Sequence, residues 1–166
     1  MTAWTADTLR AEIEAFIAAH HTVSLATVAE NGEAHAANVL YAPDGLSLVW
    51  TSDTETRHSR HIAARPRVEA TIAPDYDDFR KIRGLQIEGE ALRLDDPGPA
   101  RALLMARYSF LAQLATAPVA LLAAWRKAAF YRLTPSRITL IDNTRGFGHK
   151  AAIDIDASGV VSVIAP

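Results

Sequence analysis

Residues 82–94 read IRGLQIEGEALRL and predict one long β-strand that bends part-way along. The residues that face one side of this strand are apolar or small as far as Ala91. After Ala91, Leu92 and Leu94 place the apolar side chains on the opposite side. This change of phase beside Gly89 predicts a bulge or bend, which would let the strand curl. Strong curling together with several short antiparallel strands is typical of a small closed barrel rather than a flat sheet.

Strand and helix patterns on both sides of this stretch predict a mainly β, α+β fold. Asn31-Gly32 predicts a tight hairpin between the first two strands. The second of these strands is apolar or small apart from Asn38, so we expect it to be buried on both faces. Strands are expected in residues 22–29, 34–42, 46–51, 67–73, 82–94, 130–133 and 137–142, turns at 43–45 and 134–136, helices at 5–20, 97–117 and 119–125, and a final hairpin in 152–166.

The composition limits the classes of function. With 166 residues the chain fits a single domain, residues 1–166, that can bury a core without cross-links. It has no cysteine, which excludes disulfides, thiolate nucleophiles and Cys-ligated metals, so redox chemistry would require a cofactor. A formal net charge of −2 argues against broad binding to nucleic acid. No apolar run is long enough to span a bilayer, and we expect a cytoplasmic protein that does not act at a membrane.

Residues 46–66, LSLVWTSDTETRHSRHIAARP, predict a strand, a polar turn and a short basic helix whose N-cap is Thr56. Four basic residues follow the cap: Arg57, His58, Arg60 and His61. Basic side chains in a first helical turn oppose the helix dipole, so this segment favours an anion supplied from outside, such as a phosphate group. The alternative is a solvent-exposed helix face whose arginines pair with Asp53 and Glu55.

Histidine spacing does not predict a metal site. His58 and His61 are three positions apart and could share a helix face, but no carboxylate or third histidine is spaced to complete a ligand set. His20 and His21 are adjacent at a predicted helix end, where cations are stabilised by the dipole. We therefore expect no bound metal.

The order of the elements and three groups of residues resemble the pyridoxamine 5′-phosphate oxidase-like split-barrel superfamily, which binds flavin mononucleotide (FMN). The matching segments are VSLATV…NGEAHAANVLY, LVWTS…TRHSRHIAARPRVEATI and IRGLQIEGEAL, and they cover nearly the whole chain. TRH, IRGLQIEGE and DNTRGFGHK together resemble a small bacterial branch of this superfamily. The resemblance implies a six-stranded antiparallel split β-barrel with peripheral helices, and a homodimer with the flavin at the subunit interface.

The resemblance also implies, position by position, which residues contact FMN. The phosphate would lie against five residues: Thr51, Ser52, Thr56, Arg57 and His58. The edge of the flavin ring would follow the strand at Asn38, Val39 and Leu40. The remaining implied contacts are Trp50, Arg83 and Gln86.

Several positions depart from the oxidases proper. Asn38 stands where those enzymes carry a phosphate-binding arginine, His58 replaces their lysine, and Gly84 replaces their flavin-contacting glutamine. Their C-terminal substrate-binding Trp and Arg motif is not evident either. These departures argue against oxidation of pyridoxamine phosphate.

Residues 142–150, DNTRGFGHK, predict a loop that can approach a partner closely, because Gly146 and Gly148 flank Phe147. We expect this loop at the mouth of the flavin site, where Phe147 would pack on the ring or gate it. His149 and Lys150 would attract an anionic substrate. The alternative is that Phe147 plugs one end of the barrel.

Three functions follow from these observations. The first is an FMN-dependent oxidoreductase acting on a small molecule, in which the cofactor carries the electrons and no catalytic residue is assigned. The second is a flavin- or haem-binding module without turnover. The third is a structural dimer without a ligand.

Overall fold

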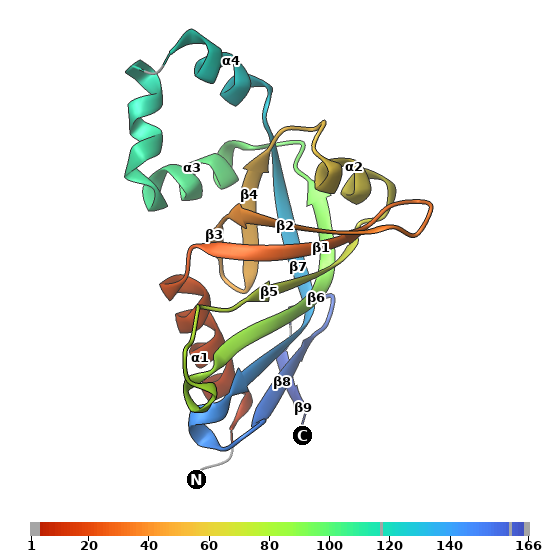
Figure 1. The fold of residues 1–166 in the computed structure, drawn as a ribbon, viewed down its shortest axis with the longest axis vertical. Coiled ribbons are helices and arrows are strands. Elements are labelled where there is room, and N and C mark those ends of the chain that lie inside the picture. The colour runs from red at the N-terminus through yellow and green to blue at the C-terminus, as the bar shows by residue number, and fades with distance from the viewer. Residues whose placement is uncertain (1–3, 117, 160, 165–166) are drawn as a thin grey trace.

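The computed structural model describes residues 4–116, 118–159 and 161–164, and its main element is one curled antiparallel sheet (Figure 1). The strand order is β2-β1-β5-β6-β7-β4-β3, with β8 paired to β7 and β9 to β8. The sheet confirms the predicted mainly β split-barrel class. The strands are β1 (Thr22–Val28), β2 (Ala34–Leu40), β3 (Ala42–Asp44), β4 (Ser47–Ser52), β5 (Arg67–Ile72), β6 (Arg83–Arg93), β7 (Ala129–Asp142), β8 (Lys150–Ile155) and β9 (Val161–Ile164).

The main path of the described sheet holds seven strands where six were expected. The additional strand is β3, which begins at Ala42, the end of the predicted second strand, and continues into the predicted turn. Gly45 adopts φ +61° after β3 and returns the chain at once, so Ala42–Asp44 pair with β4.

The helices lie around the sheet and not within it. In Figure 1, α1 (Ala6–Ala19) lies beside β8 and β9, and α2 (Arg57–Ala64) lies near the ends of β4 and β6. The helix α3 (Gly98–Arg107) packs on β3 and β4, and α4 (Val119–Lys127) follows it. Among the described residues, no helix has both the length and the apolar character that crossing a membrane requires.

The prediction of one helix through residues 97–117 is wrong. The helix α3 ends at Arg107 because Tyr108 adopts an extended backbone, and a 3₁₀ segment, Ser109–Thr116, follows. The hydroxyl of Tyr108 donates a hydrogen bond to the carbonyl of Tyr41 at 2.6 Å. This bond holds the end of the helix against the strand region and redirects the chain.

The bend predicted at Gly89 is confirmed as a break in the register between β6 and β7. Glu88 pairs with Arg137 but Gly89 pairs with Pro135, so Ser136 is the additional residue. The predicted turn at 134–136 is wrong, because β7 runs continuously through it. Proline has no N–H to give to a ladder, and a bulge is where a strand tolerates it.

The buried apolar side chains form two groups that pack on the sheet. The larger contains the buried face of α1 and much of the sheet, and the smaller lies between α3 and the strands β3, β4 and β7. α1 contributes four side chains to the larger group: Leu9, Ile13, Phe16 and Ile17. Its N-cap, Thr5, forms a reciprocal capping box with Thr8.

The first hairpin is confirmed, but its second strand is not buried. The turn places only Gly32 at positive φ, +89°, and the amide of Gly32 donates to the carbonyl of Ala29 at 3.0 Å. β2 is an edge strand whose residues alternate between exposed and half-buried. The prediction that both faces are buried is therefore wrong for the single chain, although the side chains are as apolar as expected.

Candidate anion-binding site at the start of α2

The site begins where β4 ends and the chain turns into α2. The carboxylate of Asp53 accepts a hydrogen bond from the amide of Glu55 at 2.8 Å, which forms the turn. Thr56 is the N-cap of α2, and its hydroxyl accepts from the amide of Ser59 at 3.4 Å. The predicted N-cap is confirmed. The start of α2 therefore lies beside the end of β4, as the 2.7 Å contact of Ser52 with His58 shows, and a helix start is a place where an anion is stabilised.

Two hydroxyl groups contact one imidazole at this point, and a third contacts one of the two. Nε2 of His58 lies 2.7 Å from the hydroxyl of Ser52 and 3.1 Å from that of Thr56. The hydroxyl of Thr56 also lies 2.8 Å from that of Ser59. His58 and Ser59 are buried. The structure thus brings together three of the predicted residues, Ser52, Thr56 and His58, and adds Ser59.

The arginines of α2 are not neutralised by carboxylates. In the part of the chain that the structure describes, neither Arg57 nor Arg60 forms an ion pair, and both are exposed. The alternative that they pair with Asp53 and Glu55 is wrong. Arg57 is therefore available to an anion at the start of the helix.

Two further histidines lie beside this group. The rings of His35 and His61 meet edge to face at 5.8 Å, and Nδ1 of His61 lies 3.1 Å from the hydroxyl of Thr27. Burial lowers the pKa of His58, and the neighbouring His35 and His61 lower it further. A bound anion would oppose these effects and favour the imidazolium form. Within the described residues, no group of three His, Asp or Glu side chains could hold a metal ion.

Two predicted residues beside the site are committed to other contacts. The hydroxyl of Thr51 donates to the carbonyl of Ala129 at 3.1 Å, which ties β4 to β7. Trp50 has no exposed surface and stacks on Tyr131 with the ring centroids 5.6 Å apart. The structure therefore places the indole of Trp50 in the core.

β2 lies close to α2, as their contacts and Figure 1 show. On this edge strand, Asn38 and Leu40 are exposed and Val39 is half-buried. The hydroxyl of Ser24 donates to Oδ1 of Asn38 at 2.5 Å, so the amide group of Asn38 stays available.

The structure does not bring Arg83 or Gln86 to the start of α2 within one chain. Arg83 opens β6 at the end beside α1, whereas α2 lies near the other end of that strand (Figure 1). Its guanidinium pairs with Glu12 and lies 3.3 Å from the carboxylate of the buried Asp142. Gln86 is exposed and pairs with Thr71 and Thr139 on the neighbouring strands.

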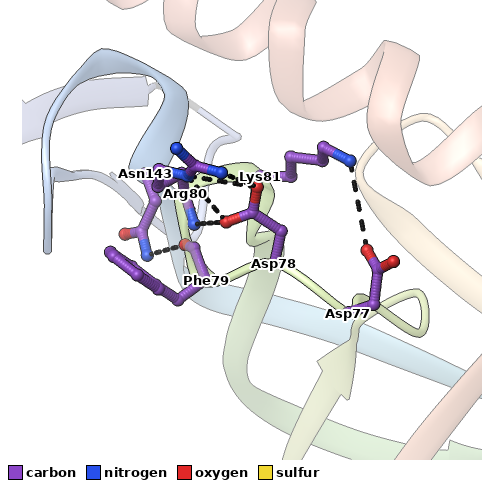
Figure 2. A network of polar contacts seen from close by, with 6 residues as sticks. All are labelled: Asp77, Asp78, Phe79, Arg80, Lys81 and Asn143. Carbon is purple, nitrogen blue, oxygen red and sulfur yellow. Dashed lines mark hydrogen bonds and ion pairs between the residues drawn. The ribbon is translucent and has the colours of Figure 1, made fainter.

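Phe147 lies on a loop that is locked to the segment before β6. Figure 2 shows the side chain of Asn143 directed at the carbonyl of Phe79, which accepts its hydrogen bond at 2.7 Å. Asn143 also accepts from the amide of Gly148 at 3.0 Å. The rings of Phe79 and Phe147 meet edge to face at 5.7 Å, and 85% of Phe147 is exposed. The hypothesis that Phe147 plugs the barrel is therefore wrong.

Sequence reasoning missed Ser59, His35 and Phe79. Ser59 had a usable signal, because it stands three residues after the cap, where side chains complete a helix N-terminus. His35 and Phe79 had none, because their partners lie 26 and 68 positions away in the sequence, at His61 and Phe147.

Residues 9–142 match the family model of pyridoxamine 5′-phosphate oxidase. The chain belongs to this family. A UPF0306 protein of Serratia proteamaculans is a relative: it is 33% identical over 144 residues, which are 84% of this chain and 90% of that protein. The alignment covers most of both proteins, so the relationship extends over nearly the whole fold.

Two solved structures share the fold of this pyridoxamine 5′-phosphate oxidase family member. A haem-binding protein from Mycobacterium smegmatis superposes with a TM-score of 0.71 at 20% identity, over 93% of this chain and 60% of its own. A pyridoxamine 5′-phosphate oxidase-related, FMN-binding protein from Nostoc punctiforme superposes with a TM-score of 0.66 at 16% identity, over the full length of both chains. Proteins with this fold therefore include a haem-binding protein and an FMN-binding protein.

Proposed function

We propose that this chain binds FMN with the phosphate at the start of α2, and that it acts as a cytoplasmic flavin-dependent oxidoreductase on a small molecule. The observation that carries the proposal is the combination of an exposed, unpaired Arg57 with the hydroxyls of Ser52 and Thr56 around His58. Hydroxyls, helix amides and cationic side chains are the groups that hold a phosphate. The donor set fits this part of FMN.

The chain's own residues would anchor and orient the cofactor, and FMN would supply the electron transfer. Arg57 would pair with the phosphate, and the hydroxyl of Ser52 would donate to its oxygens. The hydroxyl of Thr56 donates to the carbonyl of Asp53 at 2.9 Å and would have to turn from it to reach the phosphate. The exposed backbone edge of β2 would run along the ring at Asn38, Val39 and Leu40, and Asn38 stands in place of the arginine of the oxidases proper. The FMN-binding structural neighbour from Nostoc punctiforme supports the choice of cofactor.

The second candidate is a haem- or flavin-binding module without turnover, and the haem-binding neighbour favours it. The visible spectrum of freshly purified protein, followed by titration with FMN and with haemin, separates the candidates. We expect a flavin spectrum that bleaches when a reduced nicotinamide is added. A haem spectrum, or a bound flavin that no electron donor reduces, would favour the module.

We propose that the active form is a homodimer with the flavin between the subunits. β2 is the last strand on its side of the described sheet, and its Leu40 is 46% exposed. Arg83 and Gln86 lie away from α2 in one chain. A second copy would cover the apolar edge and bring those residues toward the other subunit's flavin.

Light scattering at micromolar concentration is expected to give the mass of two chains. Leu40→Glu should shift the mass to one chain, because it places a charge in the buried interface. Met105→Glu is the matched control, since Met105 is 47% exposed but lies on α3. A wild-type monomer that binds flavin fully would contradict the dimer.

Phe147→Ala is expected to change the fluorescence of bound flavin or the access of substrate, with little change in melting temperature. The ring is almost fully exposed and contacts Phe79, so its removal leaves no large cavity. Thermal melts and flavin titrations of the variant measure both effects. Unchanged flavin behaviour would remove this loop from the proposed site.

A further inference from the structure

A pocket of 340 Å³ lies between α2 and the last residues of β6, on the side of α2 that packs on the sheet. Its size is within the range of small-molecule sites, which is roughly 300–1,000 Å³. We call it the α2–β6 pocket, and nine residues line it: Thr54, Ser59, Arg60, Ile62, Ala63, Pro66, Leu92, Arg93 and Tyr131.

The floor of the pocket is an aromatic ring held in a fixed position. Tyr131 is only 3% exposed, and its ring stacks on the fully buried Trp50 with an angle of 16° between the planes. Within the described residues, the hydroxyl of Tyr131 forms no hydrogen bond, and its oxygen is not one of the buried polar atoms that lack a partner. The oxygen is therefore accessible from the pocket, where water or a ligand can bond to it.

One wall of the pocket is apolar and open to solvent. Leu92 is 55% exposed although it belongs to a strand, and Ile62 and Pro66 lie beside it. Burying Leu92 under a flat apolar group would stabilise the complex, whereas Tyr131 is already buried and only shapes the floor.

The rim of the pocket is positive. Arg60 and Arg93 line it, and within the described residues neither forms an ion pair or a side-chain hydrogen bond. None of the nine lining residues is acidic. Guanidinium groups bind carboxylates through paired hydrogen bonds, so this rim favours an anionic group.

We propose that the α2–β6 pocket binds a small aromatic carboxylic acid, with its ring on Tyr131 and Leu92 and its carboxylate between Arg60 and Arg93. The pocket alone carries the proposal, and flavin at the neighbouring site is not required. The two sites share one wall, because the hydroxyl of Ser59 lies 2.8 Å from that of Thr56, the N-cap. A ligand here is therefore a candidate substrate or effector of the flavin site.

Titration calorimetry with 2-naphthoate, and with its neutral analogue 2-naphthalenemethanol, tests the proposal. We expect 2-naphthoate to bind about tenfold tighter or more than the alcohol, because one charge-assisted hydrogen bond supplies that factor. Arg93→Gln should remove most of this preference and leave the melting temperature unchanged, since Arg93 is exposed and unpaired. Arg10→Gln, on the exposed face of α1, should leave the preference intact.

Three outcomes would overturn the assignment: no binding of 2-naphthoate, equal affinity for the alcohol, or full preference retained in Arg93→Gln. Repeating the titration with saturating FMN separates this proposal from the flavin proposal. If FMN displaced 2-naphthoate by direct competition, the ring of FMN would occupy the α2–β6 pocket. That result would contradict the claim that the pocket is separate from the flavin site. Binding of 2-naphthoate by protein that binds no FMN would support the pocket and contradict the proposed cofactor.

Discussion

Gly89→Ala is expected to destabilise the fold by about 3 kcal/mol or more, the upper range for overpacking in a protein interior. A Cβ at this position would lie 2.3 Å from the carbonyl oxygen of Thr134 and 2.9 Å from Cα of Pro135. Both are backbone atoms of β7, so neither can move without breaking the pairing of β6 with β7. The free energy of unfolding, measured by chemical denaturation, gives the effect.

Gly98→Ala is the matched control for this substitution. Gly98 opens α3, and its Cβ would meet only the side chain of Asp96, whose Oδ1 lies at 3.1 Å and accepts a hydrogen bond from the amide of Gly98. A side-chain end can rotate away, so we expect a change within about 1 kcal/mol. Wild-type stability in Gly89→Ala would contradict the bulge that joins β6 and β7.

Arg57→Ala is expected to weaken FMN binding by about tenfold to a hundredfold. Arg57 is the exposed cation at the start of α2, and a charge-assisted hydrogen bond contributes roughly 1.5–3 kcal/mol. Because no described carboxylate pairs with Arg57, its removal should leave the melting temperature of the apoprotein unchanged. Fluorescence titration of FMN into both proteins measures the ratio.

Arg10→Ala provides the comparison, because Arg10 is a surface arginine of α1 that pairs with Glu14. It removes the same charge from the chain and should leave the FMN affinity unchanged. Equal losses in the two variants would mean that net charge, and not a contact at α2, holds the phosphate.

The sequence predicted the elements whose cause is local. The curl of β6 was predictable because the change of phase and the glycine stand in the same strand. The start of α2 was predictable because its cap and its basic residues follow one another within residues 56–61.

Features that depend on distant partners were not predictable in this way. Pro135 ordinarily ends a strand, and only the matching Gly89 on β6 lets β7 continue through it. The guanidinium of Arg83 reaches Glu12, which lies 71 positions earlier in the chain. Apolar side chains on β2 indicated burial, but hydropathy does not identify what covers them.

The same difference between local and distant causes decides which parts of the site could be predicted. Ser52, Thr56 and His58 come from one short segment, so spacing along the chain was enough to place them together. The contact between His35 and His61 beside the site depends on the packing of β2 against α2. Trp50 was expected at the ligand, but its alternation in β4 directs the side chain into the core.

The central claim is that the phosphate of FMN binds at the start of α2. Titration calorimetry of the apoprotein with FMN and with riboflavin tests it most directly, because the two ligands share the ring system and differ by the phosphate. The account predicts that FMN binds at least about tenfold tighter than riboflavin, and that Arg57→Ala removes much of this difference. Equal affinities for FMN and riboflavin would contradict it.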